Sequence, residues 1–317
     1  MRRFGMVLAM AGLVMAGCSG GDAGTGLRGA MSEVSGGESD QPFAYNDLAH
    51  WRELGVLRGR EPEPDGPWQD AAYFGLDVLG VPELRDSIGV DLSAADRAVS
   101  VGYQPAAVRL DGAFDAAAVR DRLIASGGKP RKVGDHEVIS RGGYATTTIE
   151  NGGLAVRGND DPFAEVAVSD SVIATGPGLA DVLGGPVDLG DHPEYIAVAD
   201  CLGDVVTAAL RRPEAPGGVR LYGVGLRRPG SADERPSSVI CVVPEPTAGA
   251  DVRRGFTGGF TTRGTSGQGE PIGRHAEEIV HDEVESEGLT VLRAGVRHTA
   301  GSPASFFLKT FSPENHL

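Results

Sequence analysis

The chain has 317 residues, a formal net charge of −15 and a hydrophobic content of 40%. That content can support a packed core, so the chain is expected to fold. The acidic excess excludes a general nucleic-acid-binding protein, which needs clustered Lys and Arg. Three cysteines are too few for a disulfide-dense scaffold, and their odd number requires an explanation.

The N-terminus has the layout of an export signal. A basic pair of arginines at positions 2 and 3 is followed by an uncharged stretch over 4–16. This stretch is shorter than the roughly 20 residues that cross a bilayer, so it predicts a cleaved signal peptide rather than a permanent anchor. The small residue Gly17 then stands directly before Cys18.

The stretch Met15-Ala16-Gly17-Cys18 resembles the lipobox of bacterial lipoproteins, with Met15 where Leu is usual. The resemblance implies that the Cys18 thiol receives a diacylglyceryl group and that lipoprotein signal peptidase removes residues 1–17. The mature protein would then be anchored by lipid to the extracytoplasmic face of the cell membrane, which is the partner that the resemblance implies. The alternative is an ordinary secretory signal cleaved near Ala16, and the choice between general and twin-arginine export stays open.

Residues 18–42 are predicted to form a flexible tether. They are rich in Gly and Ser and lack apolar periodicity, and a chain of this composition spans roughly 25–30 Å on average. The folded body would therefore stand off the membrane, beyond the Debye length of about 8–10 Å within which its acidic charge is repelled.

The predicted elements of the body follow in chain order, placed by apolar spacing, caps and breaks. The helix over 116–125 has the clearest signals, because Asp115 can cap its start and Gly127-Gly128 can end it. The first half contains strands or extended pieces at 43–46, 98–103, 106–110, 136–140, 145–149, 154–157, 165–167 and 171–175, and further helices at 48–54, 68–79 and 178–183.

In the second half, the longest predicted helix runs from Pro193 to Arg211. Apolar residues keep helical spacing along it, Pro193 suits the first turn, and Pro213 closes it. The elements that follow are strands at 220–226 and 238–243, a short helix at 251–256, a hairpin over 278–285 and 289–298, and an apolar terminal piece at 306–311.

These elements predict an α+β fold, with antiparallel sheets and helices packed on one face. Strand pairs and single helices follow a similar rhythm in two halves, 43–190 and 191–317. The sequence leaves open whether the halves are a true repeat. The rhythm argues against Rossmann and TIM-barrel folds, which need regular strand–helix alternation.

The composition and one further segment bear on the source of the chain. Abundant Ala, Gly, Val and Asp, with few Lys, are typical of a GC-rich bacterial genome. The segment Gly112–Ser140, in which a Gly-x-Phe-Asp stretch precedes a helix, resembles uncharacterised secreted lipoproteins of actinobacteria. That resemblance implies a lineage and carries no chemistry.

Two cysteines remain once Cys18 is assigned to lipid. Cys201 lies on the apolar face of a predicted helix, and Cys241 lies in the apolar run 239–243. Exported chains meet oxidising conditions, so we predict that Cys201 and Cys241 form a disulfide. The alternative is two buried free thiols that behave as small hydrophobic side chains.

The segment 275–287 is the densest in potential metal ligands. On a strand, Glu277, His281 and Glu283 would share one side, where a cation could bind. Their spacing matches no established metal motif. We therefore interpret the segment as an edge strand whose charges oppose aggregation, and we expect neither a metal nor another cofactor.

The function is the least constrained inference. The loops 264–268, 126–130 and 176–178 match catalytic or phosphate-binding motifs only in part and are interpreted as turns, so no catalytic residue is predicted. We predict a non-enzymatic lipoprotein of the cell envelope, secreted and membrane-anchored, with an unidentified protein or small-molecule partner. The alternative is an extracytoplasmic hydrolase whose site is assembled from distant residues, because catalytic triads are built in space.

Overall fold

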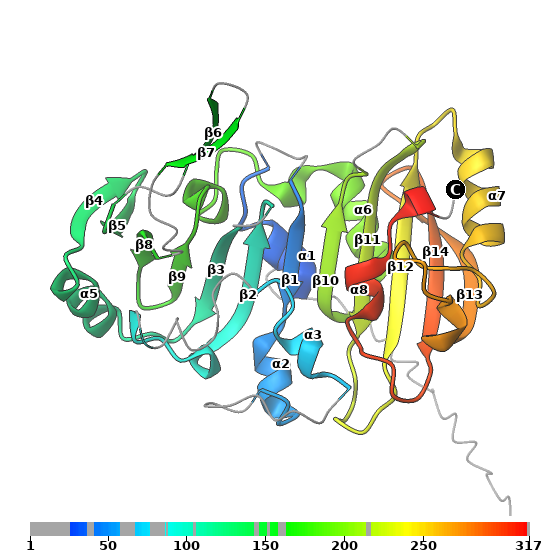
Figure 1. Ribbon diagram of the computed structural model, residues 1–317, viewed down its shortest axis with the longest axis horizontal. Helices are drawn as coiled ribbons and strands as arrows, with labels where there is room; N and C mark the ends of the chain where they lie inside the picture. The colour runs from blue at the N-terminus through cyan, green and yellow to red at the C-terminus, as the bar shows by residue number, and fades with distance from the viewer. Residues whose placement is uncertain are drawn as a thin grey trace, which may run out of the picture.

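Twelve strands form one antiparallel sheet that runs the length of the computed structural model (Figure 1). The structure describes residues 26–36, 41–57, 67–76, 86, 88–103, 106–142, 146–150, 153–157, 163–213 and 217–315. The strands are β1 (Phe43–Asn46), β2 (Ala95–Val101), β3 (Ala107–Gly112), β4 (Lys129–Val133), β5 (His136–Ser140), β6 (Thr146–Glu150), β7 (Gly153–Arg157), β8 (Glu165–Val168), β9 (Val172–Thr175), β10 (Val205–Arg211), β11 (Val219–Arg227), β12 (Ser237–Pro244), β13 (Ala276–Ser286) and β14 (Leu289–His298).

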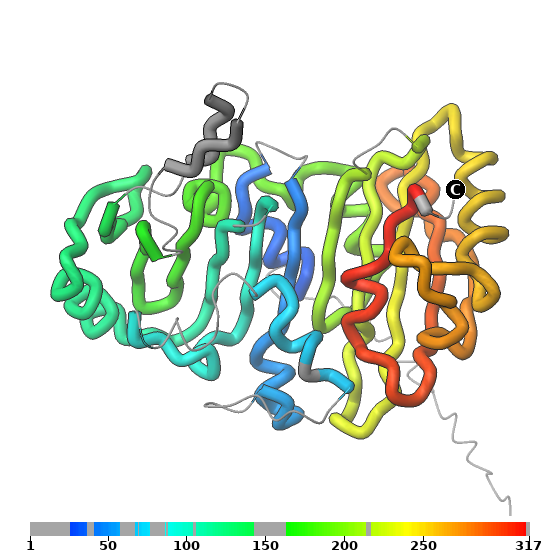
Figure 2. Tube along the Cα trace, in the orientation of Figure 1, coloured from blue at the N-terminus to red at the C-terminus, as the bar shows by residue number. Residues whose placement is uncertain are grey.

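The strand order places β1, the first of these strands along the chain, at the middle of the sheet. The order is β13-β14-β12-β11-β10-β1-β2-β3-β9-β8-β5-β4, and β6 and β7 form a separate two-stranded hairpin. Figure 2 shows β1 in blue between the two ends of the body. The edges of the large sheet are therefore β4 at one end and β13 at the other.

The helices are short and lie on both faces of the sheet (Figure 1). None of those among the described residues has the length and apolar character needed to cross a bilayer. The α-helices are α1 (Gly26–Met31), α2 (Leu48–Glu53), α3 (Gln69–Ala72), α5 (Ala116–Ala125), α6 (Pro193–Leu202), α7 (Gly249–Gly259) and α8 (Phe306–Thr310). The 3-10 turns are η2 (Leu92–Ala94), η3 (Leu179–Val182), η4 (Leu189–Asp191), η5 (Ile272–Arg274) and η6 (Pro313–Asn315).

The predicted fold class is wrong. The prediction was an α+β fold with antiparallel sheets and helices on one face, and the structure is dominated by a single sheet whose two faces are both covered. β1 hydrogen-bonds with β2 on one side and with β10 on the other, so it joins the two predicted halves into one ladder. The predicted boundary at 190/191 falls inside η4 and does not interrupt this sheet.

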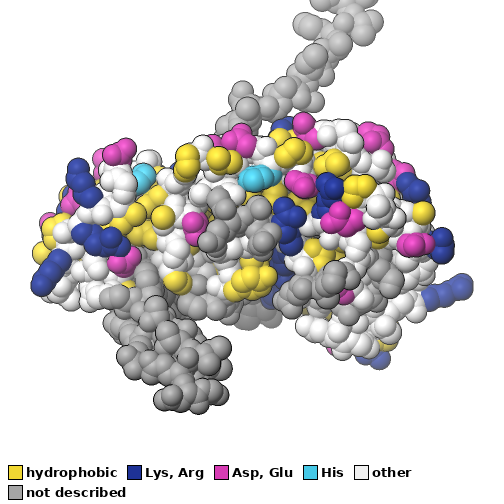
Figure 3. Space-filling model, turned by 90° about the horizontal axis from the view of Figure 1, so that it is seen from above, with side chains coloured by type: hydrophobic (Ala, Val, Ile, Leu, Met, Phe, Trp, Pro, Cys, Tyr) yellow, Lys and Arg dark blue, Asp and Glu magenta, His cyan; other side chains and the backbone are white. Residues whose placement is uncertain are grey.

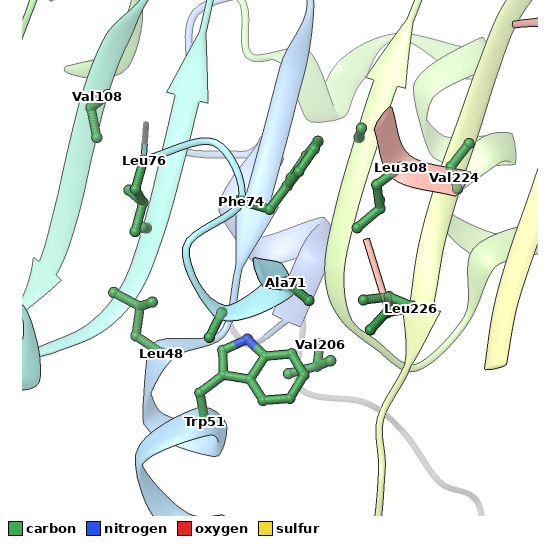
Figure 4. Close-up of a cluster of buried hydrophobic side chains, with 14 of the residues drawn as sticks. Leu48, Trp51, Ala71, Phe74, Leu76, Val108, Val206, Val224, Leu226 and Leu308 are labelled. Atoms are coloured by element: carbon green, nitrogen blue, oxygen red, sulfur yellow. The ribbon is translucent and has the colours of Figure 1, made fainter. Parts of the chain in front are cut away.

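Two apolar clusters, one on each face, form the core. The α2 face contains Trp51 and Phe256 with the residues packed around α2, α3, α7 and α8, and Figure 4 shows part of it, with Trp51 beside Val206. The α6 face contains Tyr195 and Leu202 with the residues packed around α1 and α6. Because both faces are covered, the central strands are almost continuously buried instead of alternating.

A buried asparagine ties several elements together on the α2 face. The Asn46 amide group donates to the carbonyl oxygens of Ala71, Ala72 and Phe74 at 3.0–3.2 Å. Its Oδ1 accepts from Trp51 Nε1 at 2.7 Å and from the Thr207 hydroxyl at 3.2 Å. Asn46 is 1% exposed, so β1, α2, α3 and β10 are joined through a polar group that water does not reach.

The predicted helix 193–211 is wrong in its second part. α6 ends at Leu202, Gly203 adopts φ of +67°, and the chain continues as β10. A strand buried on both faces is apolar at every position, so it also satisfies a helical spacing. The β-branched residues Val205, Val206 and Thr207 favour the strand.

The predicted flexible tether is wrong over 26–36. This segment, which we call the arm, starts with α1 and packs against the α6 face. Leu27, Ala30, Met31 and Val34 are all buried. The apolar spacing was masked in the sequence by the surrounding glycines and serines. The rest of the predicted tether lies outside the described residues, apart from 41–42.

Candidate functional site

The predicted site residues fall in three places. Cys18 and the signal segment lie outside the described residues. Cys201 on α6 and Cys241 on β12 form the expected disulfide, with their Cα atoms 6.1 Å apart on the α6 face. The bond joins the helix to the third strand from the β13 edge and has no access to solvent, since both residues are at most 1% exposed. It is therefore structural.

The candidate metal ligands are all engaged with other groups. Glu277 forms an ion pair with Arg235, and Glu283 pairs with the Arg253 guanidinium on α7, at 2.9 Å from Nη2 to Oε2. His281 Nε2 lies 2.9 Å from the carbonyl oxygen of Phe260. Burial lowers the pKa of His281, against the opposing effect of that carbonyl.

The strand register also separates these three residues. A bulge between Ala276 and Glu278 breaks the simple alternation, although His281 and Glu283 do share a face. Among the described residues, no group of three His, Cys, Asp or Glu side chains is arranged to hold a metal ion.

A polar depression lies where the arm meets the sheet. It is an open cavity of about 500 Å³ with Glu33, Arg97, Arg109 and Asp111 in its wall. Arg97 Nε donates to Asp111 Oδ2 at 2.9 Å, and Arg109 Nε donates to Asp111 Oδ1 at 2.7 Å. Both guanidiniums also pair with the Glu33 carboxylate. Two cations and two anions therefore satisfy one another across the junction.

This ion network holds the arm rather than a ligand. Burial disfavours the charge of Arg97, but Asp111 and Glu33 outweigh burial and raise the Arg97 pKa. Arg109 Nη1 also donates to the backbone oxygen of Glu33 at 3.2 Å. A β-bridge between Ser35 and Asp188 continues the attachment. Carboxylates occupy both arginines, so little donor capacity is left for a substrate.

Sequence reasoning missed this network, although a signal for it is present. Arg97 stands two residues before Val99 in β2, and Arg109 and Asp111 follow Ala107 in steps of two in β3; Val99 and Ala107 face the α6 side. A charge at an inward strand position needs a partner. That partner, Glu33, comes from a segment that composition alone had assigned to the tether.

A second polar cluster has the residue types of a hydrolase. Ser302 Oγ lies 3.1 Å from His275 Nδ1, and His275 Nε2 lies 3.0 Å from Glu270 Oε2. Ser302 is only 4% exposed, and the His275 ring stacks on Phe306 with 3.6 Å between the ring centroids. Cavities lie at the arm, beside 42–44 and 209–211, at 135–137 and at 258–264. None of these cavities is lined by Ser302, His275 or Glu270. A nucleophile needs room for a substrate, so this cluster fits a structural role better.

Next to this cluster, His298 is completely buried. Its Nε2 lies 2.7 Å from the Ser238 hydroxyl, and Phe307 packs edge-on against its ring. Burial, reinforced by nearby His275, lowers the pKa of His298 from 6.5 to about 4. The folded protein therefore requires neutral His298 over a pH range in which an exposed histidine is protonated.

Acidification is expected to destabilise the protein through His298. Above pH 6.5 the side chain is neutral in both states, but between pH 6.5 and about 4 only the unfolded chain binds the proton. This difference costs up to about 3 kcal/mol at the acidic end. The measurement is urea unfolding from about pH 7 to pH 4 for wild type and His298→Asn. The variant should start less stable and lose less on acidification, and parallel pH profiles would contradict the assignment.

The two edges of the sheet carry opposite charge. All the basic residues of β4 are exposed, and two of the chain's three lysines lie in this strand of five residues. Figure 3 shows Lys and Arg side chains at this end of the body and others at the opposite end. The exposed residues of β13 are Glu277, Glu278, Val280, Asp282, Glu283 and Glu285. The sheet thus ends in a basic strand on one side and an acidic strand on the other.

A scan against models of protein families, a search of curated proteins and a search of solved structures each return no match to this chain. The assignment of function therefore depends on the signal segment, the arm and the surface of the sheet.

Proposed function

We propose that this chain is a secreted, lipid-anchored protein of the cell envelope that acts by binding and not by catalysis. Lipid on Cys18 would hold it at the extracytoplasmic face of the membrane. The folded body would present the ends of its sheet to a partner. Main-chain groups and side chains at a sheet edge are a common means of protein recognition.

The observation that carries this proposal is the position of the arm. A chain anchored at Cys18 would join the folded body through residues 26–36. These residues attach through buried Met31 and Val34 and through the Glu33 ion network. The attachment site is central, against β2, β3, α6 and β10, and both edge strands remain uncovered among the described residues. This arrangement supports a body that is held at its middle and leaves the edge strands β4 and β13 available to a partner.

The remaining polar clusters support binding over catalysis. The Ser302 hydroxyl is buried beside a stacked histidine, and the arginines of the arm junction are neutralised by carboxylates. The pocket near Phe43 and Ser100 is only about 120 Å³. These sites are too small or too fully satisfied to hold a substrate against a reactive group.

The Cys18→Ala variant tests the anchor. The wild type should partition into the detergent-rich phase and incorporate labelled palmitate, whereas Cys18→Ala should move to the aqueous phase and lose the label. Ser19→Ala is the matched control, because it leaves the lipid acceptor in place and should behave as wild type. Retention of label and of membrane fractionation in Cys18→Ala would contradict the proposal.

A further inference from the structure

We propose that copies of this chain associate end to end, with the basic β4 edge of one copy against the acidic β13 edge of the next. This inference rests on the proposed binding function and names its partner as a second copy of the chain. It concerns the only two strands of the large sheet, within the described residues, that have a neighbour on one side alone.

The argument starts from how edge strands avoid self-association. Charge on an edge strand normally prevents pairing, because the same charge on a second copy repels it. That protection holds against like edges. It fails when the two edges of one sheet carry opposite signs, since each edge then meets its complement on the next molecule.

The basic edge has charge that no carboxylate neutralises. Lys129 and Lys132 are exposed and have no ion-pair partner among the described residues, while Arg131 pairs with Glu165 at 2.6 Å. Pro130 has no N–H to donate to an added strand. The contact therefore depends on the side-chain charges of β4 more than on a continuous backbone ladder.

The acidic edge retains one carboxylate, that of Glu285, without an arginine partner among the described residues. Within β13, the acidic residues at 277, 278, 282 and 283 pair with arginines of β14, α7 and the β11–β12 loop. Glu285 accepts only the Thr290 hydroxyl, at 2.7 Å. Val280 is 58% exposed between these charges and gives the edge an apolar contact at its middle.

The geometry of such a contact follows from its two different halves. β4 and β13 lie at opposite ends of the sheet, so the interface joins unlike surfaces and leaves a free edge at each end of a dimer (Figure 1). A head-to-tail interface of this kind adds further copies, either to an open row or to a closed ring. Association should weaken with salt, because its main attraction is between exposed charges.

Charge reversal of each edge tests the proposal. Lys129→Glu with Lys132→Glu makes both edges acidic, and Val280→Lys with Glu285→Lys adds positive charge to the acidic edge. These positions avoid the existing Arg–carboxylate pairs. Glu53→Lys, at the exposed end of α2 beside the central strand β2, changes the net charge away from both edges and is the control.

Sedimentation velocity of the exported full-length chain carrying Cys18→Ser keeps lipid clustering out of the measurement. At about 50 mM salt, the protein with unmodified edges and the Glu53→Lys control should associate with increasing concentration, and about 500 mM salt should suppress this association. Each edge variant alone should lose association by more than about tenfold, and an equimolar mixture of the two edge variants should recover it.

The mixture distinguishes the proposal from a nonspecific charge effect. Recovery on mixing requires that the basic edge of one variant meet the acidic edge of the other. A wild type that stays monomeric at low salt, or edge variants that associate as well as the control, would overturn the proposal. A monomeric protein that still carries lipid on Cys18 would leave the anchored binding function intact with another partner.

Discussion

Replacing Asn46 with leucine is expected to lower the free energy of unfolding by about 4 kcal/mol. The change removes the partner of three carbonyl oxygens, of the Trp51 indole N–H and of the Thr207 hydroxyl, all in the core of the α2 face. Each polar group left buried and unpaired costs about 1–3 kcal/mol. Some relaxation of α3 toward water offsets part of the sum. Chemical denaturation monitored by tryptophan fluorescence measures the effect.

Thr207→Val is the matched control for Asn46. It keeps the shape of the side chain and removes one of the five hydrogen bonds, so it should cost about 1 kcal/mol. If Asn46→Leu is no more destabilising than Thr207→Val, the amide does not hold β1, α2 and α3 together in the way the contacts indicate.

Removing the disulfide with Cys201→Ala and Cys241→Ala is expected to cost about 4 kcal/mol in the chain-entropy model. The two residues are 40 positions apart, so the bond closes a long loop that includes β10 and β11. The truncated side chains also leave space between α6 and β12 in the core of the α6 face. The transition midpoint in guanidinium measures the loss.

Reductant provides the control for the disulfide. Dithiothreitol should shift the wild-type midpoint toward that of the double variant and should leave the double variant unchanged. Alkylation of the unfolded chain should first show that the reductant has opened the disulfide. If the wild-type midpoint is then the same with and without reductant, the bond contributes nothing to stability.

Local signals predicted the elements that depend on local structure. α5 has the expected bounds, with Asp115 accepting from the backbone N–H of Ala118, and β5 has the expected bounds 136–140. β4 was missed because its charged residues and Pro130 are atypical of a strand, and its pairing with β5 compensates for them. Weak propensity is overridden wherever a neighbouring strand supplies the hydrogen bonds.

The fold class could not be predicted because it depends on pairings between distant strands. If β1 paired with β2 alone, the strands would form two sheets; because β1 also pairs with β10, they form one. β10 is more than 150 positions away from β1 in the chain, so local sequence does not indicate this pairing. The same applies to the candidate sites. The pairing of Cys201 with Cys241 was predicted from the expected oxidising compartment, whereas the partners of Glu33 and Asn46 lie on elements that only the folded sheet brings together.

The central attachment of the arm determines how the body is oriented when it is pulled. A body attached at one end would extend away from the membrane, and its far end would not contact neighbouring molecules on the same surface. Under the proposed anchoring on Cys18, this body would be held near the middle of its sheet, against β2, β3 and β10, with one sheet edge on either side of the attachment. A force applied through residues 26–36 would act first on the Glu33 ion pairs and on buried Met31. The two edges would then lie at a similar height above the membrane as those of adjacent anchored molecules.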